Sequence, residues 1–505
     1  MIMRTLLSAI VGSGLAILLC AGCVVGPNYR RPTAAMPALF KELPTPADVA
    51  TATWQPAQPG EDRIRAPWWE AFDDPLLTSL EERARSSNQT VAQADATFRA
   101  ARAAIRAARA DFFPTVSIGA SASRARPSGG VVSGSAPGAT NDFQLPFDFS
   151  YEADVWGRVR RSVEASVTSA QASSADVQTA LLSVSSELAV DYFELRGLDA
   201  QRDLLTRTIA AYERALQLTT DRFNQGVASG IDVAQAQTQL ETTRTQATDL
   251  GVARAQFEHA IATLAGEAPA DLTIPPAVTD TVPPVIPVTM PSQLVERRPD
   301  VAAAERRAAS ANALIGVAKT AYFPTLSLTG SAGVQSSRLG ALLSLPSRFW
   351  SIGPSLVETV FDGGRRRALT DEAIASYEEA VAAYRQSVLT AFQDVEDNLA
   401  ALRVLAEEAG QADAAVTAAN RSLALANQQY VAGLTSYLQV ITAQTAALAA
   451  QLTAVDVRTR RMTASVLLVK ALGGGWSAAE LPAAHTLQRR VGSSPGAETG
   501  EKEPR

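Results

Sequence analysis

The chain contains the same unit twice. Residues 223–227 (FNQGV) correspond to residues 430–434 (YVAGL), an offset of 207 positions, as from Gly226 to Gly433. Other motifs recur at this offset or at 210: residues 156–158 and 363–365, residues 233–237 and 440–444, and, at 210, residues 113–115 and 323–325. A duplication this long predicts two quasi-equivalent halves, so we expect a fold with an internal two-fold repeat.

The N-terminus has the pattern of a bacterial lipoprotein signal. An apolar run from Leu6 to Leu19 follows Arg4 and ends in CAGC at residues 20–23. The run is too short and too rich in glycine for a good membrane span, and it fits a secretory signal. The small residues before Cys23 predict a signal peptide at residues 1–22 and a covalent lipid on Cys23. The alternative is an ordinary secretory signal with two incidental cysteines.

Composition excludes several classes of function. Signal cleavage leaves only Cys23, which the lipid would consume, so we expect no disulfide or thiol chemistry. The formal charge is −6 without a basic block, so nucleic acid is not an expected partner. His259 and His485 stand alone, so we expect no metal site. No apolar stretch after the signal reaches membrane-span length, so any membrane crossing must use strands.

Each repeat supplies two candidate strands. Residues 115–123 and their copy at 325–332 alternate small polar with apolar side chains. Residues 143–155 alternate more clearly, with aromatic and aliphatic side chains on one face and carboxylates on the other, a pattern typical of lipid outside and water inside. In the copy at 349–361, Glu358 falls on the apolar phase, which predicts a bulge or the end of the strand. An antiparallel sheet on a soluble core is the alternative.

The remainder is predicted to be helical. Residues 158–224 contain no proline and one glycine, and apolar residues follow heptad-like steps. Such a helix is roughly 100 Å long. After a turn at residues 225–230 the chain should return as a helix from 231 to about 266. A separate helix at about 76–110 is also half as long, so two half-length helices stacked end to end would match one long helix.

Four motifs together resemble a known family, the outer-membrane factors of tripartite efflux systems, of the OprM/NodT type of lipoprotein channel within the TolC superfamily. They are CVVGPNY at 23–29, PWWEAFDDPL at 67–76, FDGGR at 361–365 and ALGGGW at 471–476. The resemblance covers residues 23–476. Val24 differs from the aspartate that retains similar lipoproteins at the inner membrane, which agrees with an outer-membrane location.

The resemblance implies both the fold and the partners. Three identical chains would make one channel: a twelve-stranded β-barrel in the outer membrane, with four strands from each chain, continued by a long α-helical barrel in the periplasm. The homotrimer would bind a periplasmic adaptor protein and, through it, an inner-membrane RND pump. Physical reasoning agrees, because four strands cannot close a barrel and open sheet edges are not tolerated in lipid.

The chain is thereby predicted to divide into six segments. After the signal peptide come a lipidated segment, the first repeat, a Pro-rich crossover, the second repeat and a tail that is disordered from residue 492: residues 23–74, 75–266, 267–298, 299–476 and 477–505. Pro299 should occupy the first turn of a helix. Residues 473–475 (GGG) should be a chain reversal with a helix C-cap rather than a phosphate loop, and residues 365–367 (RRR) a solvated helix start.

The turns after the long helices are the candidate functional site. The resemblance implies that they form the periplasmic entrance and contact the adaptor, through Gly226, Val227, Ser229, Gly433, Leu434, Thr435 and Ser436. The two glycines should adopt positive φ, and Ser229-x-x-Asp232 and Ser436-x-x-Gln439 have the pattern of capping boxes.

The same resemblance implies an aperture. The family commonly places acidic residues six or nine positions after the second glycine, where this chain has Gln439 and Thr442. The predicted aperture residues are therefore Asp232 and Gln235 from the first repeat with Gln439 and Thr442 from the second. Asp232 alone keeps the acidic pattern, and whether it gates the channel or only caps a helix stays open.

The predicted function is a passive exit duct for small molecules, without catalysis or a cofactor other than the lipid. Two alternatives are an outer-membrane channel for type I protein secretion and a periplasmic coiled-coil lipoprotein scaffold, against which the strand alternation argues. A lipoprotein hydrolase is a further one. The Gly-x-Ser-x-Gly pattern at residues 492–496 lies in the polar tail without a flanking strand, so it cannot be a nucleophile elbow. The sequence does not name the substrate.

Overall fold

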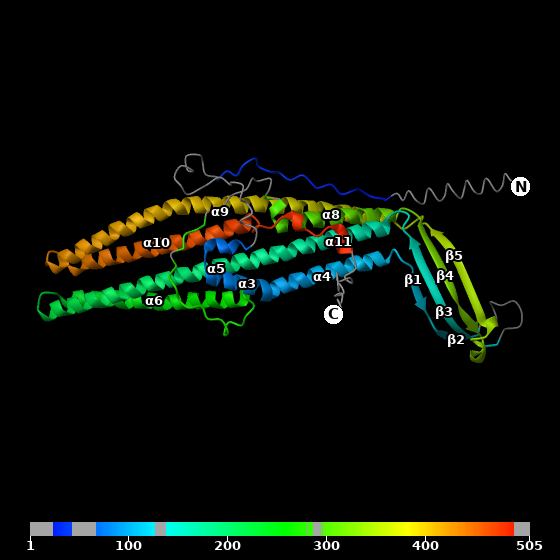
Figure 1. The fold of residues 1–505 in the computed structure, drawn as a ribbon, viewed down its shortest axis with the longest axis horizontal. Coiled ribbons are helices and arrows are strands. Elements are labelled where there is room, and N and C mark those ends of the chain that lie inside the picture. The colour runs from blue at the N-terminus through cyan, green and yellow to red at the C-terminus, as the bar shows by residue number, and fades with distance from the viewer. Residues whose placement is uncertain are drawn as a thin grey trace, which may run out of the picture.

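The structure is a computed structural model that describes residues 24–42, 67–126, 138–279, 281–284, 286, 294 and 296–488. A long bundle of helices carries a small antiparallel sheet at one end (Figure 1). The predicted signal peptide, the predicted lipidation site Cys23 and the tail from residue 489 lie outside the described residues.

The long helices and their return helices repeat with identical lengths. Helices α5 (Arg158–Asn224) and α9 (Arg365–Val431) each have 67 residues, and α6 (Gly230–Leu264) and α10 (Tyr437–Ala471) each have 35. Every boundary in the second half lies 207 positions after its counterpart. Each long helix with its return helix forms one hairpin (Figure 1). The helix predictions made from proline spacing are confirmed.

The shorter helices contain one correction. The single helix expected at 76–110 is in fact two, α3 (Pro75–Ser87) and α4 (Gln89–Ala110). Asn88 separates them because its backbone is extended and its side chain accepts hydrogen bonds from the amides of Thr90 and Val91, as a helix N-cap does. The Asn88 side chain also donates to the carbonyl of Leu264 at 2.8 Å.

That contact joins α4 to the end of α6, so half-length helices do stack end to end, as predicted. The copy of α4 is α8 (Pro299–Thr320), of equal length, with Pro299 at its first position as expected. Its start abuts the end of α10, where Arg298 donates to the carbonyl of Ala471 at 3.4 Å.

The sheet consists of β1 (Thr115–Ile118), β2 (Ser121–Ala125), β3 (Thr140–Ala153), β4 (Thr325–Ser336) and β5 (Arg348–Val357). The order is β1-β3-β4-β5, and β2 also pairs with β3. The predicted first strand is split, but β1 and β2 pair with β3 in one continuous register. Pro146 causes the split because it has no N–H, so it can only accept from the Gly119 amide, at 3.0 Å. Strand β5 ends immediately before Glu358, as predicted.

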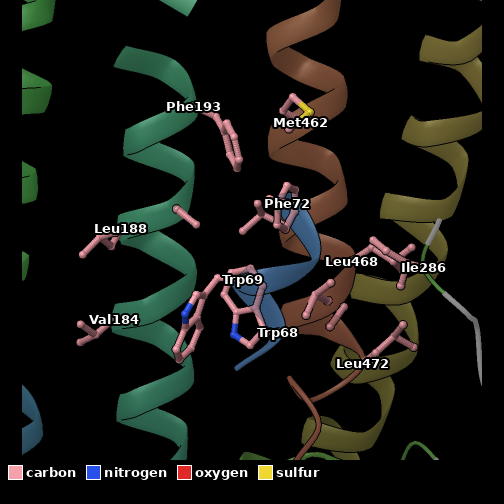
Figure 2. Close-up of a cluster of buried hydrophobic side chains, with 14 of the residues drawn as sticks. Trp68, Trp69, Phe72, Val184, Leu188, Phe193, Ile286, Met462, Leu468 and Leu472 are labelled. Carbon is pink, nitrogen blue, oxygen red and sulfur yellow. The ribbon is translucent and has the colours of Figure 1, made fainter. Parts of the chain in front are cut away.

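The main core lies midway along the bundle. The short helix η2 (Trp68–Phe72) inserts three buried aromatic side chains between α5 and α10, and Figure 2 shows them with Phe193 and Met462. This is the tryptophan-rich motif singled out in the sequence, and its role here is packing.

The crossover between the repeats is held by buried charges. The Asp199 carboxylate accepts from Arg196 at 2.9 Å, from Arg254 at 2.7 Å and from the amide of Ala277 at 3.1 Å. Both arginines also donate to crossover carbonyls, those of residues 274 and 275. Residues 274–277 of the crossover are therefore held against α5 and α6.

The beginning of the predicted tail is ordered. Helices η5 (Ala478–Glu480) and α11 (Ala484–Gln488) follow the glycine turn, and Leu487 is buried against Ile105 and Val159. Residues 473–475 all have positive φ, which confirms the predicted chain reversal. The predicted disorder from residue 492 lies outside the described residues.

Helix α10 corrects one expectation. Of the described helices, only α10 is long and apolar enough to cross a membrane by composition, with a mean hydropathy of 1.3 over its best window. The expectation that no such stretch follows the signal is therefore wrong by that measure. The cause is its alanine-rich sequence, and alanine allows close helix packing: Val440, Ala447 and Val466 are buried within the bundle. We interpret α10 as a bundle helix.

Candidate functional site: the hairpin tips

Both hairpins end in the same turn. At the first tip the Gly226 amide donates to Phe223 and the Val227 amide to Arg222, each at 2.9 Å, which is a Schellman motif. At the second tip Gly433 and Leu434 repeat the pattern. The two glycines have φ of 77° and 75°, and a side chain at either would meet no atom within 4 Å. Backbone conformation, not lack of space, requires glycine at both tips.

The first tip has the predicted capping box. The Ser229 hydroxyl accepts from the amides of Ile231 and Asp232, and the Asp232 carboxylate accepts from the Ser229 amide at 3.2 Å. The amides of Ser229 and Ile231, at the start of α6, thereby gain side-chain acceptors. Asp232 therefore caps this helix, whatever further role its charge has.

The second tip corrects the prediction. Ser436 is the N-cap of α10, but its side chain makes no capping hydrogen bond, so the predicted Ser436–Gln439 capping box is wrong. The start of α10 is instead held by packing. The rings of Tyr430 and Tyr437 lie 5.1 Å apart, and burial raises the pKa of the Tyr437 hydroxyl to about 12. The corresponding positions of the first tip are Phe223 and Gly230, which cannot form this pair.

The four aperture residues occupy equivalent positions on two hairpins. Asp232 corresponds to Gln439 and Gln235 to Thr442, because each pair is 207 residues apart. The Thr442 hydroxyl donates to the Leu438 carbonyl of its own helix at 2.9 Å. Among the described residues, no hydrogen bond joins the first-repeat pair to the second-repeat pair. A single chain therefore does not assemble the predicted aperture.

The sequence did not reveal that the two hairpins are joined within the chain. Arg222, in the last turn of α5, donates to the carbonyl of Val431 at 3.1 Å, and its guanidinium lies 4.9 Å from the ring centre of Tyr430. A cation is favourable there because Val431 ends α9, where helix carbonyls are unsatisfied. The sequence does show an arginine in the last turn of α5, but it does not show that the partner of this arginine lies on the other hairpin.

A row of carboxylates on α5 was also missed. Glu187, Asp191 and Glu194 follow one another at spacings of four and three residues, so they share one face of the helix. Burial, reinforced by the charges of Glu187 and Glu194, raises the pKa of Asp191 to about 6. The spacings of four and three residues between these carboxylates are visible in the sequence and could have identified the row.

The strand register gives the sheet one apolar face and one polar face. Phe147 pairs with Ile118 and Ala332, and Ala332 pairs with Trp350, so these side chains share a face. The neighbouring Asp148 pairs with Ser117 and Ser331 on the opposite face. No described part of the chain covers the apolar face, since its large side chains are 53–77% exposed: Val116, Ile118, Phe147, Trp350, Ile352 and Leu356.

Comparison with known proteins identifies the family. A family model described as outer membrane efflux protein matches residues 80–267 and 290–474, which together form most of the chain. The chain belongs to this family. The toluene efflux pump outer membrane protein TtgF of Pseudomonas putida is 33% identical over 466 residues, covering 90% of this chain and 95% of TtgF.

Two further comparisons agree. The antibiotic efflux pump outer membrane protein ArpC of Pseudomonas putida is 31% identical over 471 residues, covering 93% of this chain and 96% of ArpC. The solved structure of the outer-membrane channel OprN superposes with a TM-score of 0.82 at 31% identity, covering 90% of this chain and all of that one. This efflux protein is thus located in the outer membrane and extends into the periplasm, and its role is transport rather than catalysis.

Proposed function

We propose that three copies of this chain form one passive exit duct through the outer membrane. The observation that carries the proposal is the two-faced sheet, with an uncovered apolar face suited to lipid and a polar face suited to a water-filled lumen. The strands β1/β2 and β5 are free edges of that sheet. Free edges cannot face lipid, so each must pair with a neighbouring chain. Because β1 and β2 together occupy one position beside β3, each chain contributes four strands, and three chains give a twelve-stranded barrel.

The first prediction concerns this assembly. Purified in mild detergent, the wild-type protein should have the mass of a homotrimer by native mass spectrometry and should form a conducting pore in planar bilayers. Edge pairing supplies the reason, because four strand positions cannot close a barrel and the free edges of each sheet must pair with other chains. A stable monomer that inserts into membranes would contradict the proposal.

The helices continue the duct in the proposed trimer. Residues 75–266 and 299–476 are then the two repeats, with residues 267–298 crossing between them. The hairpin tips are the periplasmic entrance and the docking site for an adaptor protein, which links the duct to an inner-membrane RND pump. Large apolar side chains at the tips support a docking role, since Val227, Ile231 and Leu434 are 62–79% exposed.

The proposed substrates are small molecules. The printed names of two relatives refer to toluene and to antibiotics, and both relatives match this chain over nine-tenths of its length or more. These names favour small-molecule export over type I protein secretion, which is the second candidate. The particular substrate of this chain is set by the pump that delivers it.

The proposal includes a lipid anchor on Cys23. The next residues lie where the sheet meets the helices: the Val25 amide donates to the Trp156 carbonyl at 3.1 Å, between the end of β3 and the start of α5. Trp156 stacks on Phe323 at 4.7 Å beside this boundary, as aromatic side chains do at membrane interfaces. A lipid on the preceding residue would therefore start at the periplasmic surface of the membrane.

Cys23→Ser tests the anchor. The mature wild-type protein should carry a diacylglyceryl group and an amide-linked acyl chain by intact mass, and the variant should lack them and reach the outer membrane more slowly. Channel conductance should persist, because the barrel buries far more apolar surface than the acyl chains do. Unmodified Cys23 in the mature wild-type protein would disprove lipidation.

Asp232 provides the test of the aperture. In the trimer three Asp232 carboxylates would approach one axis and favour cations in a narrow mouth. Asp232→Asn and Asp232→Ala should therefore both lower the cation-to-anion permeability ratio in planar bilayers. Only Asp232→Ala removes the acceptor for the Ser229 amide, at a cost of about 0.5–2 kcal/mol in local stability. Unchanged selectivity in both variants would leave Asp232 with its capping role alone.

A further inference from the structure

The end of the sheet farthest from the helices carries four arginines, Arg124, Arg126, Arg338 and Arg348, which we call the arginine rim. Two of them lie in strands, so the register assigns their faces. Arg348 shares the face of Trp350, two residues further along β5, and Arg124 shares the face of Ala122, which pairs with Phe143. Both arginines are therefore on the apolar face of the sheet, at its outer end.

The arginine rim lacks a counter-charge within the described part of the chain. All four side chains are exposed, and none forms an ion pair with any residue that the structure describes. Asp142 is the carboxylate at this end of β3, and it accepts from Gln144 at 2.6 Å and from Gln335 at 3.1 Å. Residues 127–137, which connect β2 to β3, contain no acidic side chain in their sequence.

The loop between β4 and β5 adds apolar surface to this end. Its residues 337–347, here called the leucine loop, expose Leu339, Leu343 and Leu345 by 66%, 81% and 71%. The loop is nevertheless internally bonded, because the hydroxyls of Ser344 and Ser347 donate to the Ala341 carbonyl at 2.6 and 2.7 Å. These two hydroxyls are thus satisfied inside the loop while its leucines are exposed.

At this end of the sheet the unpaired arginines and the exposed leucines occur together with an exposed tryptophan. Trp350 is 77% exposed on the apolar face, two residues from Arg348. Tryptophan prefers the boundary between hydrocarbon and headgroups, and arginine on a lipid-facing surface is tolerated only near that boundary. A guanidinium also matches a phosphate group with two parallel hydrogen bonds. All three features fit the outer surface of a bilayer.

We propose that this end of the sheet binds anionic lipid of the outer leaflet, with the arginine rim on headgroup phosphates and the leucine loop inserted among the acyl chains. The inference rests on the proposed function, in which the sheet spans the outer membrane and the helices extend into the periplasm. It goes further by assigning a lipid-binding surface to particular residues. The three copies in a trimer would form a ring of such surfaces around the channel mouth.

Lipid affinity tests the arginine rim. The probe is phosphatidylglycerol, titrated into the delipidated trimer and counted by native mass spectrometry, with phosphatidylcholine, a zwitterion without net charge, as the comparison. Arg124→Gln combined with Arg348→Gln should weaken phosphatidylglycerol binding about tenfold, since each interfacial arginine contributes severalfold. The matched control combines Arg214→Gln with Arg421→Gln, two exposed arginines at equivalent positions of α5 and α9, and it should bind as wild type.

Equal phosphatidylglycerol affinity in the rim variant and the wild type would overturn the role of the arginines. Equal affinity of the wild type for the two lipids would overturn it too, because phosphates of anionic lipid would then not be preferred. The trimer mass in the same spectra establishes that the variant has folded and assembled.

Spin labels test the leucine loop in reconstituted trimers. A nitroxide on Leu343→Cys should be more accessible to oxygen than to a water-soluble nickel complex, as expected for a lipid contact. Nickel accessibility, or short distances between the three labels with neither reagent reaching them, would overturn lipid insertion; the second result would mean that the leucine loops pack on one another. A label on Ile352→Cys separates the two proposals, because water at Ile352 would contradict a membrane-spanning sheet itself.

Discussion

Gly473→Ala is expected to prevent assembly of the channel. Gly473 ends α10 with φ of 93°, and a Cβ there would lie 2.0 Å from the carbonyl oxygen of Arg297, just before α8. The substitution combines left-handed backbone strain with a collision against backbone that cannot turn away. We expect a loss of roughly 3 kcal/mol or more, from strain and from separation of the stacked helices. The measurement is the yield and thermal stability of detergent-resistant oligomer.

Gly410→Ala is the matched control for this substitution. Gly410 lies inside α9, and a Cβ there meets nothing within 4 Å. Alanine should stabilise the helix by about 1 kcal/mol, because glycine is a poor residue for a helix interior. If Gly473→Ala assembled as well as Gly410→Ala, the junction between α10 and α8 would not determine stability.

Glu81→Gln is expected to stabilise the protein and to remove a dependence on pH. Glu81 is fully buried on α3, and neither carboxylate oxygen has a partner at good hydrogen-bond geometry among the described residues. Ser185 and Arg85 are close enough to offset only part of the cost of burying its charge. Burial raises its pKa from 4.5 to about 8. The folded chain thus keeps a proton that the unfolded chain releases, so stability falls as pH rises from about 4.5 to about 8. At pH 7.5 the penalty is of order 2–4 kcal/mol.

Thermal unfolding between pH 5 and pH 8.5 measures this effect. The wild type should lose stability across that range, whereas Glu81→Gln should be flatter and should be more stable above neutral pH. Glu82→Gln, one residue along and exposed, makes the same chemical change without burial and should follow the wild type. Parallel pH profiles for wild type and Glu81→Gln would show that Glu81 is ionised in the folded protein.

Local signals in the sequence were sufficient for the helical part of the fold. Absence of proline gave the bounds of α5 and α9, and the two tip glycines gave the turns between long and returning helices. Helix length and helix reversal depend on neighbours within a few residues, so a short stretch of sequence contains that information. The duplication then supplied each boundary twice, and the family resemblance built on these motifs was confirmed.

Predictions that depended on distant partners fared less well. The split of the first strand follows from Pro146 on the opposite strand, and the absence of a capping box at Ser436 accompanies the packing of Tyr437 on Tyr430. The sequence shows Gly197 as the one glycine in α5, but it does not show why glycine is required there. The cause is Thr459, whose side chain would lie 2.4 Å from an added Cβ. In each case the deciding atom comes from another element.

The sequence by itself determined the elements of this protein: two long hairpins, the short helices that extend them and the strand alternation. Only the tertiary structure decided which of their surfaces meet. It joined the hairpins through Arg222, buried the Glu81 carboxyl in the core, and brought Arg124 and Arg348 onto one face of the sheet. The reason is that secondary structure is encoded in local periodicity, whereas contacts and faces depend on register between segments far apart in the chain.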